Sequence, residues 1–222
     1  MEYYAHIQED RKQSVKDHLT GTAELAGRFA AKFGKRDWGY CCGMLHDIGK
    51  YSEAFQKKIM ENGSQRVDHS TAGAQVCFAQ DSRTLYWIAA FCIAGHHAGI
   101  PDYGSPANPK SLLGRKKKQV PDYQAYQKEI AIPELKSLPF DDSHTENFSF
   151  ALSVFIRMVY SCLVDADFLD TEAFMNNGKV VRDSGESLEV LLKKLENYVS
   201  GWLRFLYKGI IINHNENRAN LH

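Results

Sequence analysis

Residues 38–56, WGYCCGMLHDIGKYSEAFQ, hold the strongest structural signals in the chain. Apolar side chains at helical spacing predict a helix over Trp38 to Ile48, and Gly49 is a helix terminator at its end. Ser52 predicts the cap of a second, short helix. His46 and Asp47 therefore lie in the last turn of a helix, where two adjacent side chains can reach one cavity.

Helical periodicity continues on both sides of this stretch. An amphipathic helix is predicted from His18 to Phe33, and another begins near Asp68, with Asp68 as its cap. Further helices are predicted over Thr84 to Ala94, Tyr123 to Ile130, Phe148 to about Leu169, and Glu186 to Tyr207. Because no run of strands stands out, the pattern predicts a compact all-α helical bundle.

The composition favours one domain spanning residues 1–222. We expect an N-terminal segment over about 1–17, a long basic loop without regular structure over 99–121, and a tail over 208–222. Basic and acidic residues number 27 each, so the chain does not bind nucleic acid by bulk charge. Five cysteines without a C-x-x-C pair indicate neither a disulfide framework nor a thiolate zinc site.

Nothing in the sequence predicts a membrane partner. The longest apolar stretch, Phe148 to Val164, is broken by Arg157 and falls short of a span. The N-terminus lacks the basic start and apolar run of a signal peptide, so we expect a cytoplasmic protein.

Histidines and aspartates gather at the predicted helix ends. This set comprises His18, His46, Asp47, His69, His96, His97 and an aspartate in LVDADFLD. Imidazole and carboxylate groups suit divalent metals such as Mn, Fe, Co, Ni or Zn, and the two oxygens of Asp47 could bridge two ions. His6, His144, His214 and His222 have no such context and are expected to be ordinary polar residues.

The order of these motifs resembles the HD phosphohydrolase superfamily. The motifs are DHLTGTAELA, GMLHDIGKYSEAFQ, VDHSTAGA, AGHHAGIPD and LVDADFLDTE. DHSTAGA and GHHAGIPD resemble, more narrowly, the HD nuclease domain of the CRISPR-associated type I helicase-nuclease. The resemblance extends from Ala5 to about Arg218.

The resemblance implies two metal sites that share one carboxylate. His18, His46, Asp47 and a late aspartate would hold one ion, and Asp47, His69, His96 and His97 the other. By the resemblance the late aspartate is Asp167, which follows the alanine in LVDADFLD, and Asp165 is the fallback. Helical spacing prevents both from facing one site. With Asp167 as the ligand, Asp165 and Asp170 are both expected to be polar or capping groups.

Lys50 resembles the lysine of an HD-x-x-K motif and would neutralise a phosphate oxygen or the leaving group. Asp47 and Lys50 are thus the expected catalytic residues. Ser70, beside His69, would orient a ligand or cap the helix that starts there.

The implied activity is a metal-dependent nuclease that cuts single-stranded DNA internally and from its ends. Two divalent ions (Mn, Ni, Co, Fe or Mg) would lower the pKa of a bridging water and neutralise charge on the phosphodiester. The basic run Arg115, Lys116, Lys117 and Lys118 could guide the DNA backbone.

The resemblance also implies partners. These are a superfamily 2 helicase and an RNA-guided surveillance complex. The sequence itself contains no nucleotide-binding G-x-x-x-x-G-K-[ST] loop of such a helicase. The tail INHNENRANLH resembles the stretch that precedes such a helicase.

Two other functions fit the sequence less well. A nucleotide phosphohydrolase or cyclic-nucleotide phosphodiesterase would keep the metal site and take a small substrate in a closed pocket. A scaffold with a vestigial site would dock a helicase, but such a site has no need to keep every ligand.

Overall fold

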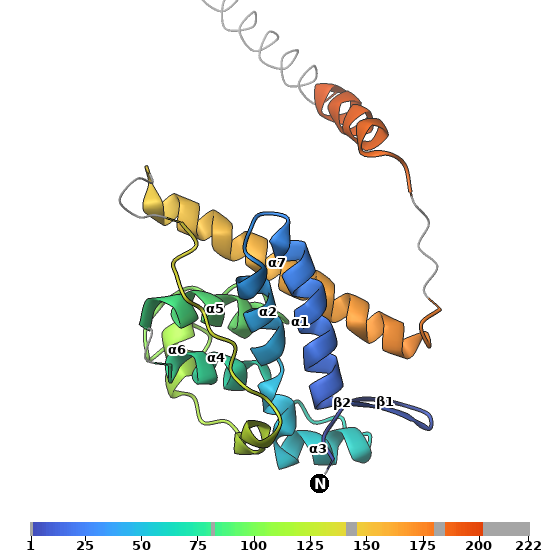
Figure 1. Cartoon of the computed structure of the whole chain (residues 1–222), viewed down its shortest axis with the longest axis vertical. Coiled ribbons are helices and arrows are strands. Elements are labelled where there is room, and N and C mark those ends of the chain that lie inside the picture. Colours follow the sequence, from blue (N-terminus) through green and yellow to red (C-terminus); the bar gives the residue numbers. More distant parts are fainter. Residues whose placement is uncertain (1, 81–82, 141–145, 180–184, 202–222) are drawn as a thin grey trace, which may run out of the picture. The chain divides into compact units, whose positions relative to one another are not determined.

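The computed structural model describes residues 2–80, 83–140, 146–179 and 185–201 (Figure 1). These residues confirm the predicted helical fold. The elements are β1 (Tyr4–Gln8), β2 (Arg11–Ser14), α1 (Val15–Ala31), α2 (Arg36–Leu45), the 3-10 helix η1 (Ile48–Tyr51), α3 (Glu53–Met60), α4 (Ser70–Phe78), α5 (Arg83–Gly95), α6 (Leu112–Lys117), the 3-10 helix η2 (Gln124–Lys128) and α7 (Phe148–Met175).

The chain divides into two compact units, residues 1–179 and 180–222. The second unit contains a helix over 188–201, within the range where the sequence predicts one. A single domain over 1–222 stays a prediction, and the tail 208–222 lies outside the described residues.

Helices α1 and α2 pack closely because glycines face the α1 backbone. A Cβ on Gly39 would lie 2.3 Å from the Ala26 carbonyl oxygen, and one on Gly43 would lie 2.4 Å from the Cα of Ala23. Helix α1 begins at Ser14, whose hydroxyl accepts a hydrogen bond from the backbone N–H of Asp17 at 3.0 Å. This close pair brings the first turn of α1 beside the end of α2.

Helices α4 and α5 form a second pair against the same core. Gly73 lets α4 approach the end of α2, because a Cβ there would lie 1.9 Å from the Leu45 carbonyl oxygen. The N-cap residue of α4 is His69, one position after the predicted cap Asp68, but the Asp68 carboxylate accepts from the Thr71 N–H at 3.1 Å. The core is dominated by aliphatic and small residues, and Cys41, Cys42, Cys77 and Cys92 are buried within it as free thiols.

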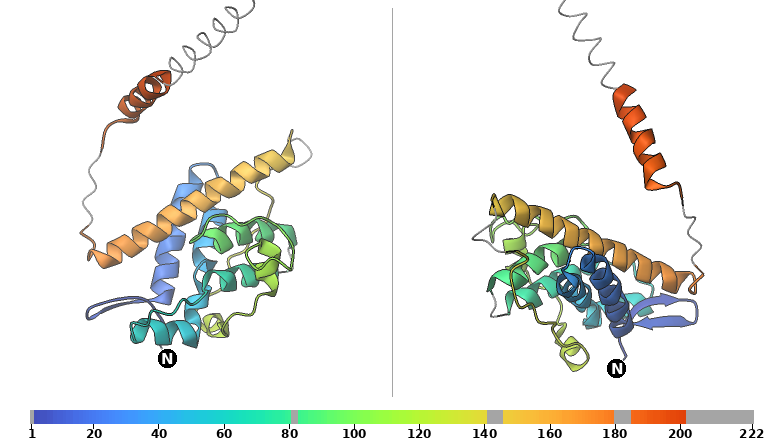
Figure 2. Two further views of the ribbon diagram at one scale, coloured as in Figure 1. Left: turned by 180° about the vertical axis from the view of Figure 1, so that it is seen from behind. Right: turned by 45° about the horizontal axis from the view of Figure 1, so that its top comes forward.

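Helix α7 crosses the bundle and contacts α1, α2 and α5 (Figure 2). It extends beyond the predicted end at Leu169. By length and composition alone it could cross a membrane, with a mean hydropathy of 1.5 over an 18-residue window, a test that the core helix of a soluble protein also passes. That the apolar stretch falls short of a span stays a prediction. Its contacts with three helices favour a packed helix, and the cytoplasmic location stays a prediction.

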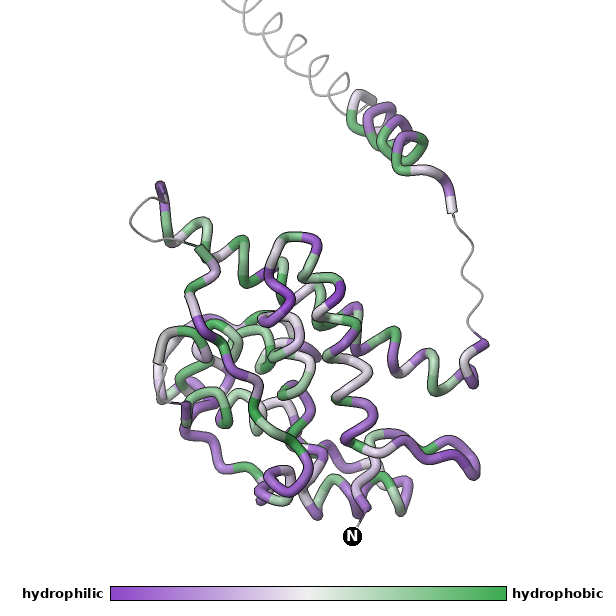
Figure 3. Tube along the Cα trace, viewed as in Figure 1, coloured by the Kyte–Doolittle hydropathy of each residue, from purple (hydrophilic) through white to green (hydrophobic). Residues whose placement is uncertain are grey.

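Other parts of the fold also differ from the sequence prediction. The helix predicted over Tyr123 to Ile130 is the 3-10 helix η2. The segment 99–121 was expected to lack regular structure, but it contains α6, which starts at the buried Ser111; the hydroxyl of Ser111 accepts from the Gly114 N–H at 3.1 Å. No strands were expected, yet β1 and β2 pair as an antiparallel hairpin. Figure 3 shows that this hairpin is largely hydrophilic, so it lacks the apolar alternation that reveals a strand.

We predict that Gly73→Ala lowers the free energy of unfolding by about 1–3 kcal/mol, because the new methyl group meets backbone that cannot move aside. Gly63→Ala is the control, since the nearest atom to its Cβ is 3.7 Å away. Urea denaturation of both variants measures the difference. Equal stability would show that the α4 contact tolerates a Cβ.

Candidate metal centre

Asp47 occupies the centre of the site because the chain leaves helical geometry there. Helix α2 ends at Leu45, and Asp47, with φ −111° and ψ 24°, precedes η1. The next turn lies against the segment before α4, where a Cβ on Gly49 would be 2.4 Å from the His69 carbonyl oxygen. The carboxylate of Asp47 is consequently enclosed, with a side-chain exposure of 1%.

One oxygen of Asp47 faces ligands from α1, α2 and α7. Its Oδ2 lies 3.3 Å from His18 Nε2 and 3.5 Å from His46 Nε2. The Oδ1 of Asp167 lies 3.4 and 3.6 Å from the same two nitrogens. These four residues each offer a ligand atom within 4.8 Å of the others and could hold a metal ion.

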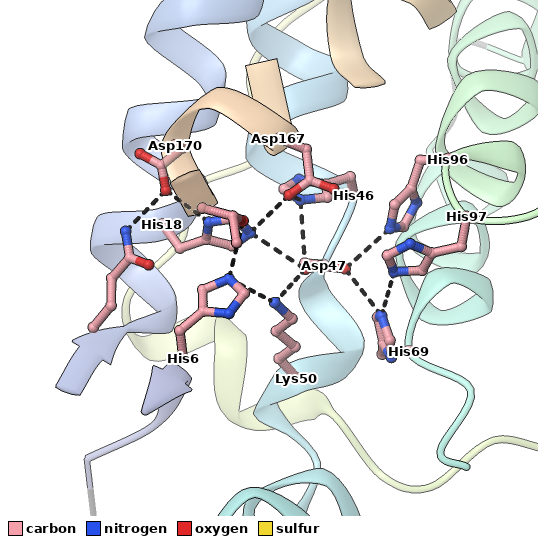
Figure 4. A network of polar contacts seen from close by, with 12 residues as sticks. His6, His18, His46, Asp47, Lys50, His69, His96, His97, Asp167 and Asp170 are labelled. Carbon is pink, nitrogen blue, oxygen red and sulfur yellow. Dashed lines mark hydrogen bonds and ion pairs between the residues drawn. The ribbon is translucent and has the colours of Figure 1, made fainter. Parts of the chain in front are cut away.

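The other oxygen of Asp47 faces the start of α4 and the end of α5. Its Oδ1 lies 3.2 Å from His96 Nε2 and 3.5 Å from His69 Nε2. His97 approaches from the outer side, with its Nε2 2.6 Å from that of His69. Asp47, His69, His96 and His97 form the second group that could hold an ion, and Figure 4 shows Asp47 between the two groups.

The central atoms of both groups lack hydrogen-bond partners. Five such buried atoms converge here: Nε2 of His18, of His46 and of His96, and both carboxylate oxygens of Asp47. Buried polar atoms left without partners cost free energy, and a divalent cation in each ligand group would satisfy them. The residues present therefore fit a metal.

The outer ring nitrogens fix the direction of each imidazole. His46 Nδ1 donates to the Gly43 carbonyl at 2.8 Å, and His96 Nδ1 donates to the Ile93 carbonyl at 2.7 Å. His69 Nδ1 donates to the Val67 carbonyl at 3.1 Å. A proton held on Nδ1 leaves the Nε2 lone pair free toward the centre, which is how metal-binding histidines are oriented.

His18 is oriented by a carboxylate instead. Its Nδ1 lies 2.8 Å from Asp170 Oδ2, which also accepts from Gln13 Nε2 at 2.8 Å. Gly21 makes room for this contact, because a Cβ there would lie 2.0 Å from Asp170 Oδ1. Asp170 is thus a polar group outside both ligand groups, as expected, but its role in orienting His18 was not predicted. Its position three residues after Asp167, on the same helix face, was the available signal.

Lys50 points at Asp47 rather than at solvent. Its Nζ lies 2.7 Å from Asp47 Oδ2, and the residue is 5% exposed. His6, on β1, lies next to it, with Nε2 3.4 Å from Lys50 Nζ and 3.3 Å from the Thr171 hydroxyl. His6 therefore belongs to the site, contrary to its expected role as an ordinary polar residue. Tertiary contacts alone bring it there.

The pKa values reflect the density of charge. Burial acts to raise the pKa of Asp47, but Lys50 and the nearby imidazoles hold it well below its usual range. Burial and then Lys50 act to lower the pKa of His18, but the carboxylates of Asp167, Asp170 and Asp47 outweigh them and raise it to about 9. Burial, followed by Lys50, lowers the pKa of His6 to about 3. The carboxylate of Asp47 thus stays ionised and attracts positive charge.

Other predicted site residues lie outside the two groups. Asp165 is exposed, whereas Asp167 points into the site, as the resemblance favours. Ser70 accepts from an Arg115 guanidinium nitrogen at 3.1 Å and donates to Asp68 at 3.4 Å, so it supports the start of α4.

The basic run on α6 makes contacts within the protein. Lys118 pairs with Asp68 at 2.5 Å, and the Nζ of Lys116 lies 4.6 Å from the centre of the Trp87 ring. With Arg115 bound to Ser70, three of the four cations hold α6 against α4 and α5. Their role in guiding DNA stays a prediction, and only Lys117 is described without such a contact.

We predict that Mn²⁺ binding raises the melting temperature of the wild-type chain, because the cation satisfies buried ligand atoms. Asp170→Ala should weaken Mn²⁺ affinity by about 10- to 100-fold, since His18 loses the group that orients it. Calorimetric titration measures both affinities. Asp165→Ala, an exposed change on the same helix, is the control and should bind like wild type.

Comparison with known families identifies the superfamily to which the chain belongs. The HD domain family matches residues 15–130, a range that contains six of the seven predicted ligands and leaves out Asp167. Comparison with curated proteins finds no match. The matched range covers more than half of the chain, and with Asp167 its histidines and Asp47 form the two groups described above. The chain therefore belongs to the HD-domain superfamily of metal-dependent phosphohydrolases.

Proposed function

We propose that this HD-domain protein is a nuclease that cleaves phosphodiester bonds in single-stranded DNA, both internally and from the ends. The proposal rests on the position of the Asp47 carboxylate, because each of its two oxygens faces a different ligand group. Two-metal centres of this kind act on phosphodiesters by stabilising both the attacking and the leaving oxygen.

The residues of the chain have distinct parts in this reaction. The seven ligands would hold two divalent ions, and Asp47 would be common to both. When bound, these ions supply a water of lowered pKa and positive charge opposite the phosphodiester. Lys50 adds a fixed cation at the same carboxylate, where it would neutralise a phosphate oxygen or the leaving group.

The shape of the site favours a polymer over a free nucleotide. A cavity of about 450 Å³ opens to solvent beside the ligands, and its lining includes Asp47, Lys50, His69 and Asp167. Phe168 stands at this cavity with 62% of its surface exposed. A chain of nucleotides can pass such an open site, whereas a nucleotide hydrolase encloses its substrate.

The cellular setting follows from the sequence resemblance. The GHH motif supplies His96 and His97, and DHS supplies His69, so both motifs of the CRISPR-associated branch contribute to the second ligand group. We infer that the chain degrades foreign DNA with a superfamily 2 helicase after recruitment by an RNA-guided surveillance complex. The complete set of ligands argues against a vestigial scaffold.

Asp47→Ala tests the proposed function. We expect it to abolish nicking of circular single-stranded DNA by the metal-free protein resupplied with Mn, Ni, Co or Mg, because both ligand groups lose their shared member. Asp165→Ala should cleave like wild type. Cleavage by a folded Asp47→Ala variant at the wild-type rate would contradict the assignment, and wild type that leaves DNA intact but hydrolyses nucleotides would favour the alternative.

A double-mutant cycle tests the contact between Lys50 and His6. Lys50→Ala should reduce kcat by about 100-fold, the usual cost of losing one group that stabilises transition-state charge. His6→Ala should reduce kcat less, and should add little in the Lys50→Ala background because it acts through Lys50. Fully additive losses would show that His6 acts independently, and His6→Gln should restore part of the rate.

A further inference from the structure

A second cavity lies next to the metal centre. It has a volume of about 390 Å³ and is formed by one face of α3 together with the segment that leads to His69. We call it the basic pocket, because its lining includes Lys57, Lys58 and Arg66. None of the motifs discussed above includes these three residues.

The lining of the basic pocket carries more positive than negative charge. Within the described part of the chain, Lys57, Lys58 and Arg66 form no ion pair. Of the two carboxylates in the lining, Asp68 is already paired with Lys118 and accepts from the Thr71 hydroxyl at 2.8 Å. Glu61 is the remaining carboxylate in the lining, against three cations, and Glu2 and Glu53 line another cavity together with Lys57. Basic side chains that converge without partners form a site for anions.

The basic pocket and the cavity at the metal centre share a wall. Ala54 and Phe55 are neighbours on α3, but Ala54 lines the basic pocket and Phe55 lines the metal-centre cavity. Likewise, Asp68 lines the basic pocket and its neighbour His69 lines the metal-centre cavity. The rings of Phe55 and His69 meet edge to face, with centroids 5.3 Å apart, so this ring pair belongs to the partition between the two cavities.

We propose that the basic pocket binds backbone phosphates of the nucleic-acid strand whose neighbouring phosphodiester lies at the metal centre. This inference rests on the proposed nuclease function and adds a binding site to it. A positively charged groove that follows the backbone is the usual way to hold a single strand without reading its sequence. The cations of α6 fit this task less well, since three of them already contact the protein.

The test compares two triple variants of the full chain. The first is Lys57→Gln, Lys58→Gln and Arg66→Gln. The matched control, Lys12→Gln, Lys16→Gln and Lys32→Gln, removes the same charge from exposed positions away from both cavities. The probe for binding is a fluorescent oligothymidylate, measured by anisotropy without divalent metal over a range of salt concentrations.

The first variant should bind the oligonucleotide more weakly, with a salt dependence of log K shallower by about 2, because each phosphate contact on a single strand contributes about 0.7. The control should keep the wild-type slope. An equal slope in wild type and the first variant, or an equal loss in both variants, would overturn the proposal.

A small substrate separates this inference from the proposed function. Bis(p-nitrophenyl) phosphate has one phosphodiester and does not extend into the basic pocket, so the first variant should hydrolyse it with Mn²⁺ at the wild-type rate. If wild type fails to hydrolyse it and also leaves DNA intact, the nuclease function fails, whatever the binding slopes show. A normal rate on the small substrate with an unchanged slope refutes the basic pocket alone.

Discussion

The burial of one carboxylate, that of Asp47, is the constraint on which the rest of the site depends. An ionised carboxylate taken out of water is costly unless opposite charge or hydrogen-bond donors surround it. Asp47 is 1% exposed and neither of its oxygens accepts a hydrogen bond, so its compensation is Lys50 and a ring of imidazoles. This arrangement is unfavourable without a cation and favourable with one, which links the stability of the site to metal binding.

The helices meet around this carboxylate by their ends. Residues at helix ends can direct neighbouring side chains into one cavity. Backbone carbonyl oxygens that are free at helix ends accept hydrogen bonds from the Nδ1 atoms of the histidines. Gly43 has both functions, since its missing Cβ admits α1 while its carbonyl oxygen accepts from His46. Close packing of the bundle and orientation of the ligands therefore depend on the same residues.

The helical fold could be predicted because its signals are local, and the seven candidate ligands because the order of their motifs resembles one family. Apolar periodicity marks α1, α2 and α5, and the histidines stand beside the caps and glycines that end helices. The hairpin was missed because its strands are short and polar, and α6 was missed within a segment rich in proline and glycine. His6 and Asp170 were missed for other reasons. His6 reaches the site through a contact with Lys50, which no local pattern in the sequence shows. Asp170 lies on the same helix face as Asp167, and this spacing was a signal that the sequence prediction did not use.

The central claim is that Asp47 joins two divalent ions. Electron paramagnetic resonance of the wild-type chain loaded with Mn²⁺ tests it most directly, because two ions that share a carboxylate couple magnetically. The account predicts two Mn²⁺ per chain with the spectrum of a coupled pair, and loss of the coupling in Asp47→Asn. A single bound ion, or two ions with uncoupled spectra, would contradict it.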